Sequence, residues 1–179
     1  KKEKKILNIG CVNFNYKQIK SYEKKSNNKF FDYVQLHYNF FERQAEKEII
    51  PYCLKYKKKI IANRIFGSGI FVKRNNKNKN KRLYSSDRLL KKYKSQKKKI
   101  LFFFNELEKL NIDEKYFLIS WMKKFAKINI LLFGVSQSTD ISTIMNYFNK
   151  PLNIKLIRYI DKIIKKNFDL YNLPKSFHE

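Results

Sequence analysis

Tyr33-Val34-Gln35-Leu36-His37-Tyr38 is a run of β-forming residues and predicts a strand. Residues 44–56 change to helical spacing, and a second short apolar run, Lys59-Ile60-Ile61-Ala62, follows them. Strand, helix and strand in this order form a unit whose right-handed crossover makes the two strands parallel. The apolar face of the predicted helix consists of Ile49, Ile50, Cys53 and Leu54.

The same alternation extends over the rest of the chain. Further strands are predicted at 6–10 and 129–134, and the second is apolar enough for burial on both faces of a parallel sheet. Helices are predicted at 15–25, 85–110, 138–148 and 154–168, and another follows Asp113 as its cap. The four strands could be half of a closed (β/α)8 barrel, which four strands alone cannot close. If they are barrel strands, either the other half is missing from this chain or a partner copy supplies it.

Length and composition predict one sizeable apolar core. The chain has 179 residues, of which 43% are hydrophobic and 16% aromatic, too many for a disordered chain. No apolar run reaches the length of roughly 18 residues that a membrane span needs. Two cysteines in no metal-like spacing favour a reducing compartment, and we expect the cytoplasm. Because the first residue is Lys1, we expect the native N-terminus to lie upstream.

The charge of the chain has two interpretations. Lys and Arg number 41 against 15 Asp and Glu, for a net charge of +26. Clustered cations bind nucleic acids by releasing counterions, and the Lys/Asn tract at 73–82, predicted to be an exposed loop, is the candidate for such binding. The lysines are nevertheless spread along nearly the whole chain, as A- and T-rich codons would produce, which favours a solvated basic surface.

All four glycines fall in the stretches that follow the predicted strands. Ligands of parallel α/β folds bind at the carboxyl ends of the strands, so these stretches are where a site is expected. Glycine there either brings the backbone close to a phosphate or nucleotide, or simply forms a turn. The glycines are Gly10, Gly67, Gly69 and Gly134.

Four stretches also match the motifs of one family, in order and in spacing. Ile9-Gly10-Cys11-Val12-Asn13-Phe14 is similar to I-G-V-S-N-F. Residues 34–43 and 48–53 are similar to V-Q-x-x-Y-N-L-L-E-R and E-I-L-P-Y-C, residues 61–70 to I-A-Y-S-P-L-G-S-G-L, and residues 133–136 to a G-A-S turn. With these motifs the chain resembles the C-terminal half of the aldo/keto reductases.

The resemblance implies an α/β fold of the (β/α)8 TIM-barrel type. Residues 1–179 would be the C-terminal half of such a barrel, with about four βα units and an exposed loop at 73–82. The protein would be an oxidoreductase that moves a hydride between NADP(H) and a carbonyl, and its partners would be a small carbonyl substrate and the N-terminal half of the same barrel. The catalytic Asp, Tyr, Lys and His of the family belong to that half, so no catalytic residue is assigned in this chain, and no metal site is expected.

The resemblance also implies a cofactor site. Asn13 and Gln35 would hold the nicotinamide carboxamide, since an amide pair satisfies its donor and its acceptor. The loop that contains Gly67 would lie against the pyrophosphate, and Arg64 would either contact it or be a surface arginine. Without the family, Asn13 is interpreted as a turn residue and Gln35 as a buried hydrogen bonder. The candidate cofactor residues are Asn13, Gln35, Asn63, Arg64, Phe66, Gly67, Ser68, Gly69, Gly134 and Ser136.

Several positions depart from the family pattern. Val12 replaces a serine that binds the carboxamide, and Asn63 replaces an aromatic residue. None of the family's adenosine-side residues is retained at Asp140, Thr143 or Ile144, and Asp140 would repel a 2′-phosphate unless a lysine offsets it. These departures support an alternative, a degenerate barrel without catalysis that acts as a binding or scaffold protein.

Overall fold

The structure, a computed structural model, describes residues 5–72, 97–135, 137–150 and 152–171. They belong to two units of the chain. The sheet unit comprises residues 5–65 and 127–133, and the helical unit comprises the other described residues. The predicted loop at 73–82, the start of the predicted helix at 85–110 and Ser136 lie outside the described residues.

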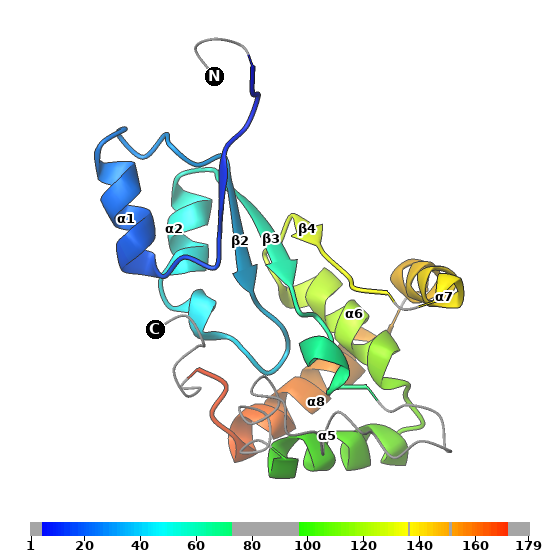
Figure 1. Cartoon of the computed structure of the whole chain (residues 1–179). Helices are drawn as coiled ribbons and strands as arrows, with labels where there is room; N and C mark the ends of the chain where they lie inside the picture. Colours follow the sequence, from blue (N-terminus) through cyan, green and yellow to red (C-terminus); the bar gives the residue numbers. More distant parts are fainter. Residues whose placement is uncertain (1–4, 73–96, 136, 151, 172–179) are drawn as a thin grey trace. The chain divides into compact units, whose positions relative to one another are not determined.

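Four parallel strands form the centre of the sheet unit (Figure 1). Their order in the sheet follows the chain, β1-β2-β3-β4, and every neighbouring pair is parallel. This arrangement confirms the predicted succession of βα units. The strands are β1 (Gly10–Val12), β2 (Tyr33–His37), β3 (Lys59–Asn63) and β4 (Ile130–Leu131).

The helices α1 (Tyr16–Lys24) and α2 (Ile49–Lys55) connect these strands. Asn15 caps α1: its side chain accepts the Gln18 N–H, and the Gln18 side chain accepts the Asn15 N–H, both at 2.9 Å. α1 and α2 meet through the rings of Tyr16 and Tyr52, whose centroids are 5.7 Å apart. The predicted helix at 15–25 is therefore confirmed.

The predicted helix at 44–56 is present only in part. A short 3-10 helix, η1 (Gln44–Glu46), precedes α2, so the segment is broken near Lys47. The predicted apolar face is also wrong at one position, because Leu54 is 45% exposed while Tyr52 is buried. A seven-residue helix has about two turns, and its inward face here is set by Ile50, Tyr52 and Cys53.

Both outer strands differ from their predictions. β1 lies at 10–12 and not at 6–10, because backbone pairing with the segment at the start of β2 begins only at Ile9, whose carbonyl accepts the N–H groups of Asp32 and Tyr33. β4 pairs with β3 alone among the described strands, and its predicted burial on both faces is wrong, because its side chains are exposed or half-buried. Ile130 and Leu132 are 42% and 48% exposed.

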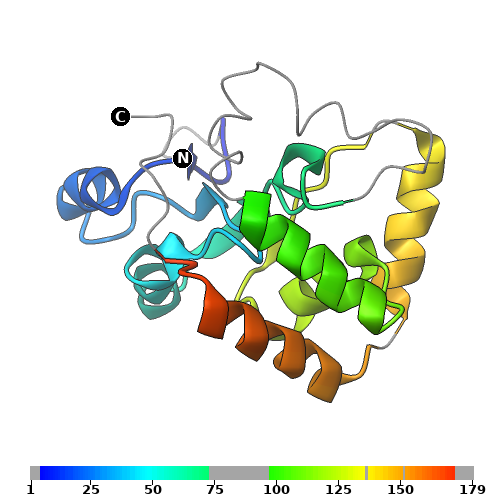
Figure 2. The ribbon, with the colours of Figure 1, turned by 90° about the horizontal axis from the view of Figure 1, so that it is seen from below.

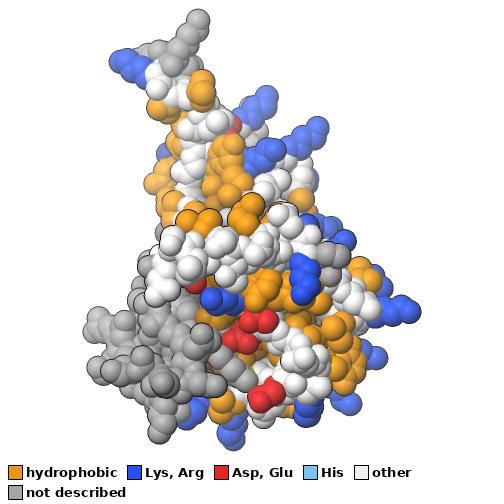
Figure 3. Space-filling view, turned by 90° about the vertical axis from the view of Figure 1, so that its right-hand side faces the viewer, with side chains coloured by type: hydrophobic (Ala, Val, Ile, Leu, Met, Phe, Trp, Pro, Cys, Tyr) orange, Lys and Arg blue, Asp and Glu red, His pale blue; other side chains and the backbone are white. Residues whose placement is uncertain are grey.

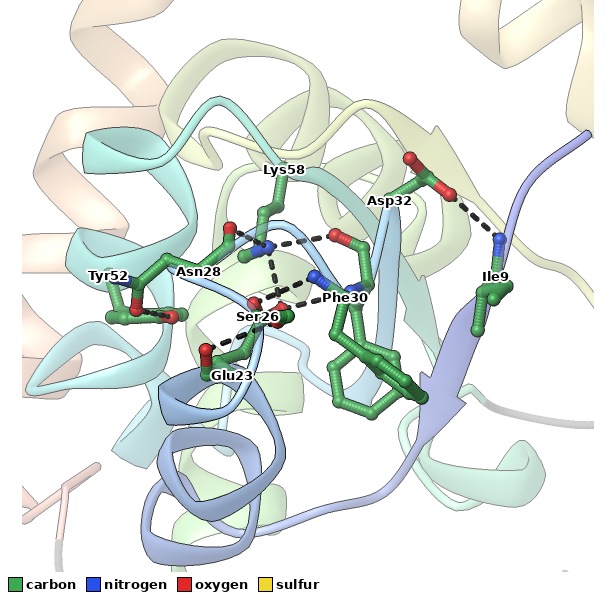
Figure 4. Close-up of polar contacts among 9 residues, drawn as sticks. Ile9, Glu23, Ser26, Asn28, Phe30, Asp32, Tyr52 and Lys58 are labelled. Atoms are coloured by element: carbon green, nitrogen blue, oxygen red, sulfur yellow. Dashed lines mark hydrogen bonds and ion pairs between the residues drawn. The ribbon is translucent and has the colours of Figure 1, made fainter. Parts of the chain in front are cut away.

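A buried ion pair connects the elements of the sheet unit (Figure 4). Lys58 Nζ lies 2.6 Å from Glu23 Oε1, and the two side chains are 2% and 0% exposed. Lys58 also donates to the carbonyls of Asn28 and Phe31, while the Glu23 carboxylate accepts the N–H groups of Phe30 and Phe31. The end of α1, the segment before β2 and the residue before β3 are thereby held together without an unpaired charge.

The helical unit consists of one 3-10 turn and four helices. The helices α5 (Lys97–Lys109) and α8 (Ile154–Asn167) lie side by side (Figure 2), and the Phe102 and Phe168 rings are 5.4 Å apart. Asp113 caps α6 as predicted, accepting the Tyr116 N–H at 2.9 Å. Within the described residues no helix is both long and apolar enough to cross a membrane. The elements are η2 (Gly67–Gly69), α5 (Lys97–Lys109), α6 (Glu114–Phe125), α7 (Ser138–Asn149) and α8 (Ile154–Asn167).

Candidate functional site

The candidate residues of the sheet unit lie in or directly after β1, β2 and β3. Asn13 follows β1, Gln35 lies in β2, and Asn63 ends β3. Successive side chains of a strand face opposite sides, and the buried side of this sheet is taken by Cys11, Val34, Leu36, Ile60 and Ala62. Gln35 and Asn63 therefore share the other face of the sheet.

Asn13 leaves β1 in the left-handed conformation, with φ +57°. Its backbone N–H donates to the Gln35 carbonyl at 2.8 Å, which joins the two predicted carboxamide-binding residues through the backbone. Its side-chain Oδ1 is buried and has no hydrogen-bond partner among the described residues. A buried acceptor without a partner is rare in proteins, so this oxygen is suited to a ligand donor.

Asn63 is engaged by its neighbour on β2. His37 and Asn63 are register partners, and the Asn63 Oδ1 lies 2.5 Å from the His37 Nδ1. An amide oxygen only accepts, so the His37 ring carries its proton on Nδ1 in this contact. The Nδ2 group is the part of the Asn63 side chain that remains to bind a ligand.

Arg64 is the next residue and has an unusual backbone. Its φ is +57°, in the left-handed region, and its carbonyl accepts a hydrogen bond from Asn39 Nδ2 at 3.1 Å. The side chain is partly buried, and its guanidinium makes no ion pair or hydrogen bond with any described residue. A guanidinium whose donors have no partner in the described part of the chain, at a strand end, is a group for binding an anion.

The glycine turn of the helical unit has a left-handed backbone over three successive residues. Gly67, Ser68 and Gly69 have φ values of +55°, +57° and +86°. The Gly69 N–H donates to the Phe66 carbonyl at 2.9 Å, which closes the turn. A β-carbon on Gly67 would lie 2.3 Å from the Phe71 ring, so only glycine fits this position.

The segment after β4 contributes less than predicted. Gly134 is exposed, and a β-carbon there would have nothing within 4 Å, so space does not require glycine. Ile144 is buried in the helical unit, and its apolar side chain offers no hydrogen bond to an adenosine. Asp140, which would repel a 2′-phosphate, lies 3.5 Å from Lys115 Nζ, so a lysine does offset its charge.

Neither cysteine is a candidate nucleophile. Burial raises the pKa of Cys11 to about 11 and that of Cys53 to about 12. Both thiols are therefore protonated near neutral pH, and a thiol reacts as its thiolate. Among the described residues, no group of three His, Cys, Asp or Glu side chains could hold a metal ion.

The basic residues on one face of the described surface are dispersed. Figure 3 shows Lys and Arg side chains scattered over one face and not gathered in a single patch. A solvated basic surface has this appearance, whereas a polyanion site would group its cations on one face. This face therefore favours a solvated basic surface, while the Lys/Asn tract at 73–82 lies outside the described residues.

Asn39, Glu42 and Arg43 form a buried polar cluster that sequence reasoning did not single out as functional. They are 0%, 2% and 1% exposed, although all three are polar. The available signal was the order Asn-x-x-Glu directly after a strand, which is typical of a side chain that caps its own turn. The bond from Asn39 to the Arg64 carbonyl could not be predicted, because it joins residues 25 positions apart.

Comparisons with known proteins identify the fold. The model of the aldo/keto reductase family matches residues 1–165. A solved structure of a glycerol dehydrogenase from Gluconobacter oxydans is similar, with a TM-score of 0.65 and 22% identity over 99% of this chain and 54% of that chain. This chain thus spans about half the length of that protein, and its four strands are a part of a (β/α)8 barrel. The search among curated proteins gives no match.

Proposed function

Since the chain belongs to the aldo/keto reductase family, we propose that it supplies the cofactor-side rim of an NADP(H)-dependent oxidoreductase. The observation that carries this proposal is the buried Oδ1 of Asn13, which has no hydrogen-bond partner among the described residues and belongs to the residue bonded to the Gln35 carbonyl. A nicotinamide carboxamide offers the N–H donor that this oxygen lacks and an acceptor for the Gln35 amide. The residues present at the ends of β1 and β2 therefore fit the group.

The phosphates of the cofactor would be bound by cationic and backbone groups. Arg64 has a guanidinium without a partner among the described residues, and it suits a pyrophosphate oxygen. The turn at Phe66, Gly67, Ser68 and Gly69 lets a ligand approach the backbone closely. The pairing of Asp140 with Lys115 supports the phosphorylated cofactor, because it lowers the repulsion of a 2′-phosphate. Gly134 and Ser136 complete the proposed set.

When bound, NADPH supplies a hydride to the carbonyl carbon of a small-molecule substrate. The part of this chain in that reaction is to orient the cofactor: an amide pair at Asn13 and Gln35 fixes which face of the nicotinamide is offered. The proton for the carbonyl oxygen would come from acid–base residues in the N-terminal half of the same barrel. Residues 1–179, with the loop at 73–82, would be the C-terminal half, inactive alone.

The compartment of this proposed enzyme is the cytoplasm. Cys11 and Cys53 are both free and buried. Free thiols persist in reducing compartments, whereas secreted proteins usually oxidise theirs to disulfides. The two thiols support this location.

A degenerate barrel that binds or scaffolds is the second candidate. Val12, at the position of the family's serine, is 54% exposed and offers no hydrogen bond, and the Asn63 oxygen is occupied by His37. This candidate predicts that the protein does not bind the cofactor, so one binding measurement distinguishes the two.

The test is an NADPH fluorescence titration of the complete protein and of the Asn13→Gly variant. Glycine keeps the left-handed backbone but removes the amide, so we expect about tenfold weaker binding, equivalent to ~1.4 kcal/mol. The matched control is Asn111→Gly, another asparagine with positive φ, +51°, in the turn between α5 and α6, and it should bind NADPH as the parent does. If the parent protein binds no NADPH, the oxidoreductase proposal is wrong.

A further inference from the structure

Asn39 is a fully buried side chain that makes every hydrogen bond an amide can make. Its Oδ1 accepts the N–H groups of Phe41 and Glu42 at 3.0 and 3.1 Å. Its Nδ2 donates to Glu42 Oε2 at 2.6 Å and to the Arg64 carbonyl at 3.1 Å. Three of these bonds close the turn at 39–42, and the fourth reaches the residue after β3. The fourth bond is not needed to form the turn.

Arg64 needs this support because of its backbone. A φ of +57° is unfavourable for a residue with a β-carbon, and such a conformation persists only where the surroundings fix it. Asn39 holds the carbonyl of Arg64, and Ile65, the next residue, is 2% exposed. The backbone is thus restrained while the guanidinium remains without a partner among the described residues.

We infer that Asn39 is a positioning residue, which holds Arg64 in the left-handed conformation and so places its guanidinium for an anionic ligand. The conformational part stands on the contacts above, and the ligand, a pyrophosphate group, rests on the proposed function. The simpler role, closing the turn at 39–42 alone, would leave Arg64 unaffected by a change at Asn39.

A stability cycle between Asn39→Ser and Arg64→Gly tests the conformational part. Serine keeps an acceptor near the Phe41 and Glu42 amides but is too short to reach the Arg64 carbonyl. Glycine adopts positive φ without support. We expect Asn39→Ser to lower the urea midpoint of the 179-residue chain, and the shift to fall by at least about half in the Arg64→Gly background, since coupled sites are not additive.

Lys57→Gly is the matched control for this cycle. Lys57 also has positive φ, +53°, but lies in the turn before β3, and none of the bonds of Asn39 reaches it. The full effect of Asn39→Ser should persist in that background. An equal effect in all three backgrounds would overturn the inference. Should Asn39→Ser alone fail to fold, rescue by Arg64→Gly but not by Lys57→Gly supports it, and rescue by neither contradicts it.

Calorimetric titration with inorganic pyrophosphate, in salt high enough to screen the surface lysines, tests the ligand part. We expect Asn39→Ser to weaken binding about fivefold, or ~1 kcal/mol. Arg64→Gly should weaken it at least as much, and Asn39→Ser should add nothing in that background. Equal affinity of parent and Asn39→Ser would overturn the ligand part. A parent protein that binds pyrophosphate but not NADPH would contradict the proposed function and leave this inference standing.

Discussion

Gly67 occupies a position that leaves no room for a β-carbon. Its φ of +55° disfavours any β-carbon. A β-carbon would also lie 2.3 Å from a ring atom of Phe71, whose side chain is fully buried. We expect Gly67→Ala to lower the free energy of unfolding by about 2 to 4 kcal/mol, from the backbone and the forced shift together. Urea denaturation of the purified chain measures it.

Gly134 supplies the control for this prediction. A β-carbon there meets nothing within 4 Å, and its φ is not positive, so Gly134→Ala should be neutral or stabilising by up to ~1 kcal/mol. Equal destabilisation by the two substitutions would show that the turn at 67–69 is not formed as described.

At the same scale, the sequence predicts where the candidate residues lie but not what they contact. The three candidate residues could be placed at one end of the sheet because parallel strands end together. Asn13 and Asn63 do lie at the carboxyl ends of β1 and β3, whereas Gln35 lies in the middle of β2, in register with Val12. That Asn63 pairs with His37, and that Arg64 takes positive φ, depends on contacts across strands that no local pattern encodes.

The elements of the sheet unit depend on one buried ion pair. Lys58→Met would leave the Glu23 carboxylate with its amide donors but without its cation, in a place of zero exposure. We expect a loss of about 3 to 5 kcal/mol in the free energy of unfolding, the usual cost of an uncompensated buried charge. Chemical denaturation gives the value, and the double variant Glu23→Gln with Lys58→Met should recover part of the loss.

The matched control for Lys58→Met is Lys165→Met in α8, where the ion pair lies at the surface. Lys165 pairs with Asp161 at 2.9 Å, but its side chain is 42% exposed, so solvent screens the pair. The loss should stay below ~1 kcal/mol. A small loss at both positions would contradict the burial of Lys58.

Elements at the centre of the sheet were predicted better than those at its edges. In β2 and β3 buried residues alternate with exposed or half-buried ones. The bounds of both strands agree with the prediction within one residue. β1 and β4 have one partner each, so their length is set by pairing and not by their apolar content. For this reason the strands do not include Ile6, Leu7 and Leu132, although these residues are apolar.

At the scale of the whole molecule, the sheet has two edges that a closed barrel would not have. β1 and β4 each pair with one described neighbour, whereas every strand of a (β/α)8 barrel pairs with two. Edge strands exchange their amide hydrogens sooner than central ones, because local opening breaks fewer contacts there. The two edges are therefore where the proposed N-terminal half should bind.

Hydrogen exchange of the 179-residue chain and of the complete protein tests this proposal. In the chain alone we expect the amides of β2 and β3 to exchange at least ~10 times more slowly than those of β1 and β4. In the complete protein, pairing on both sides should bring β1 and β4 to the protection of the central strands. Equal protection in the chain alone would mean that another copy covers the edges, and unchanged edges in the complete protein would contradict the half-barrel proposal. The measurement needs no substrate or cofactor, so it tests the architecture independently of the proposed chemistry.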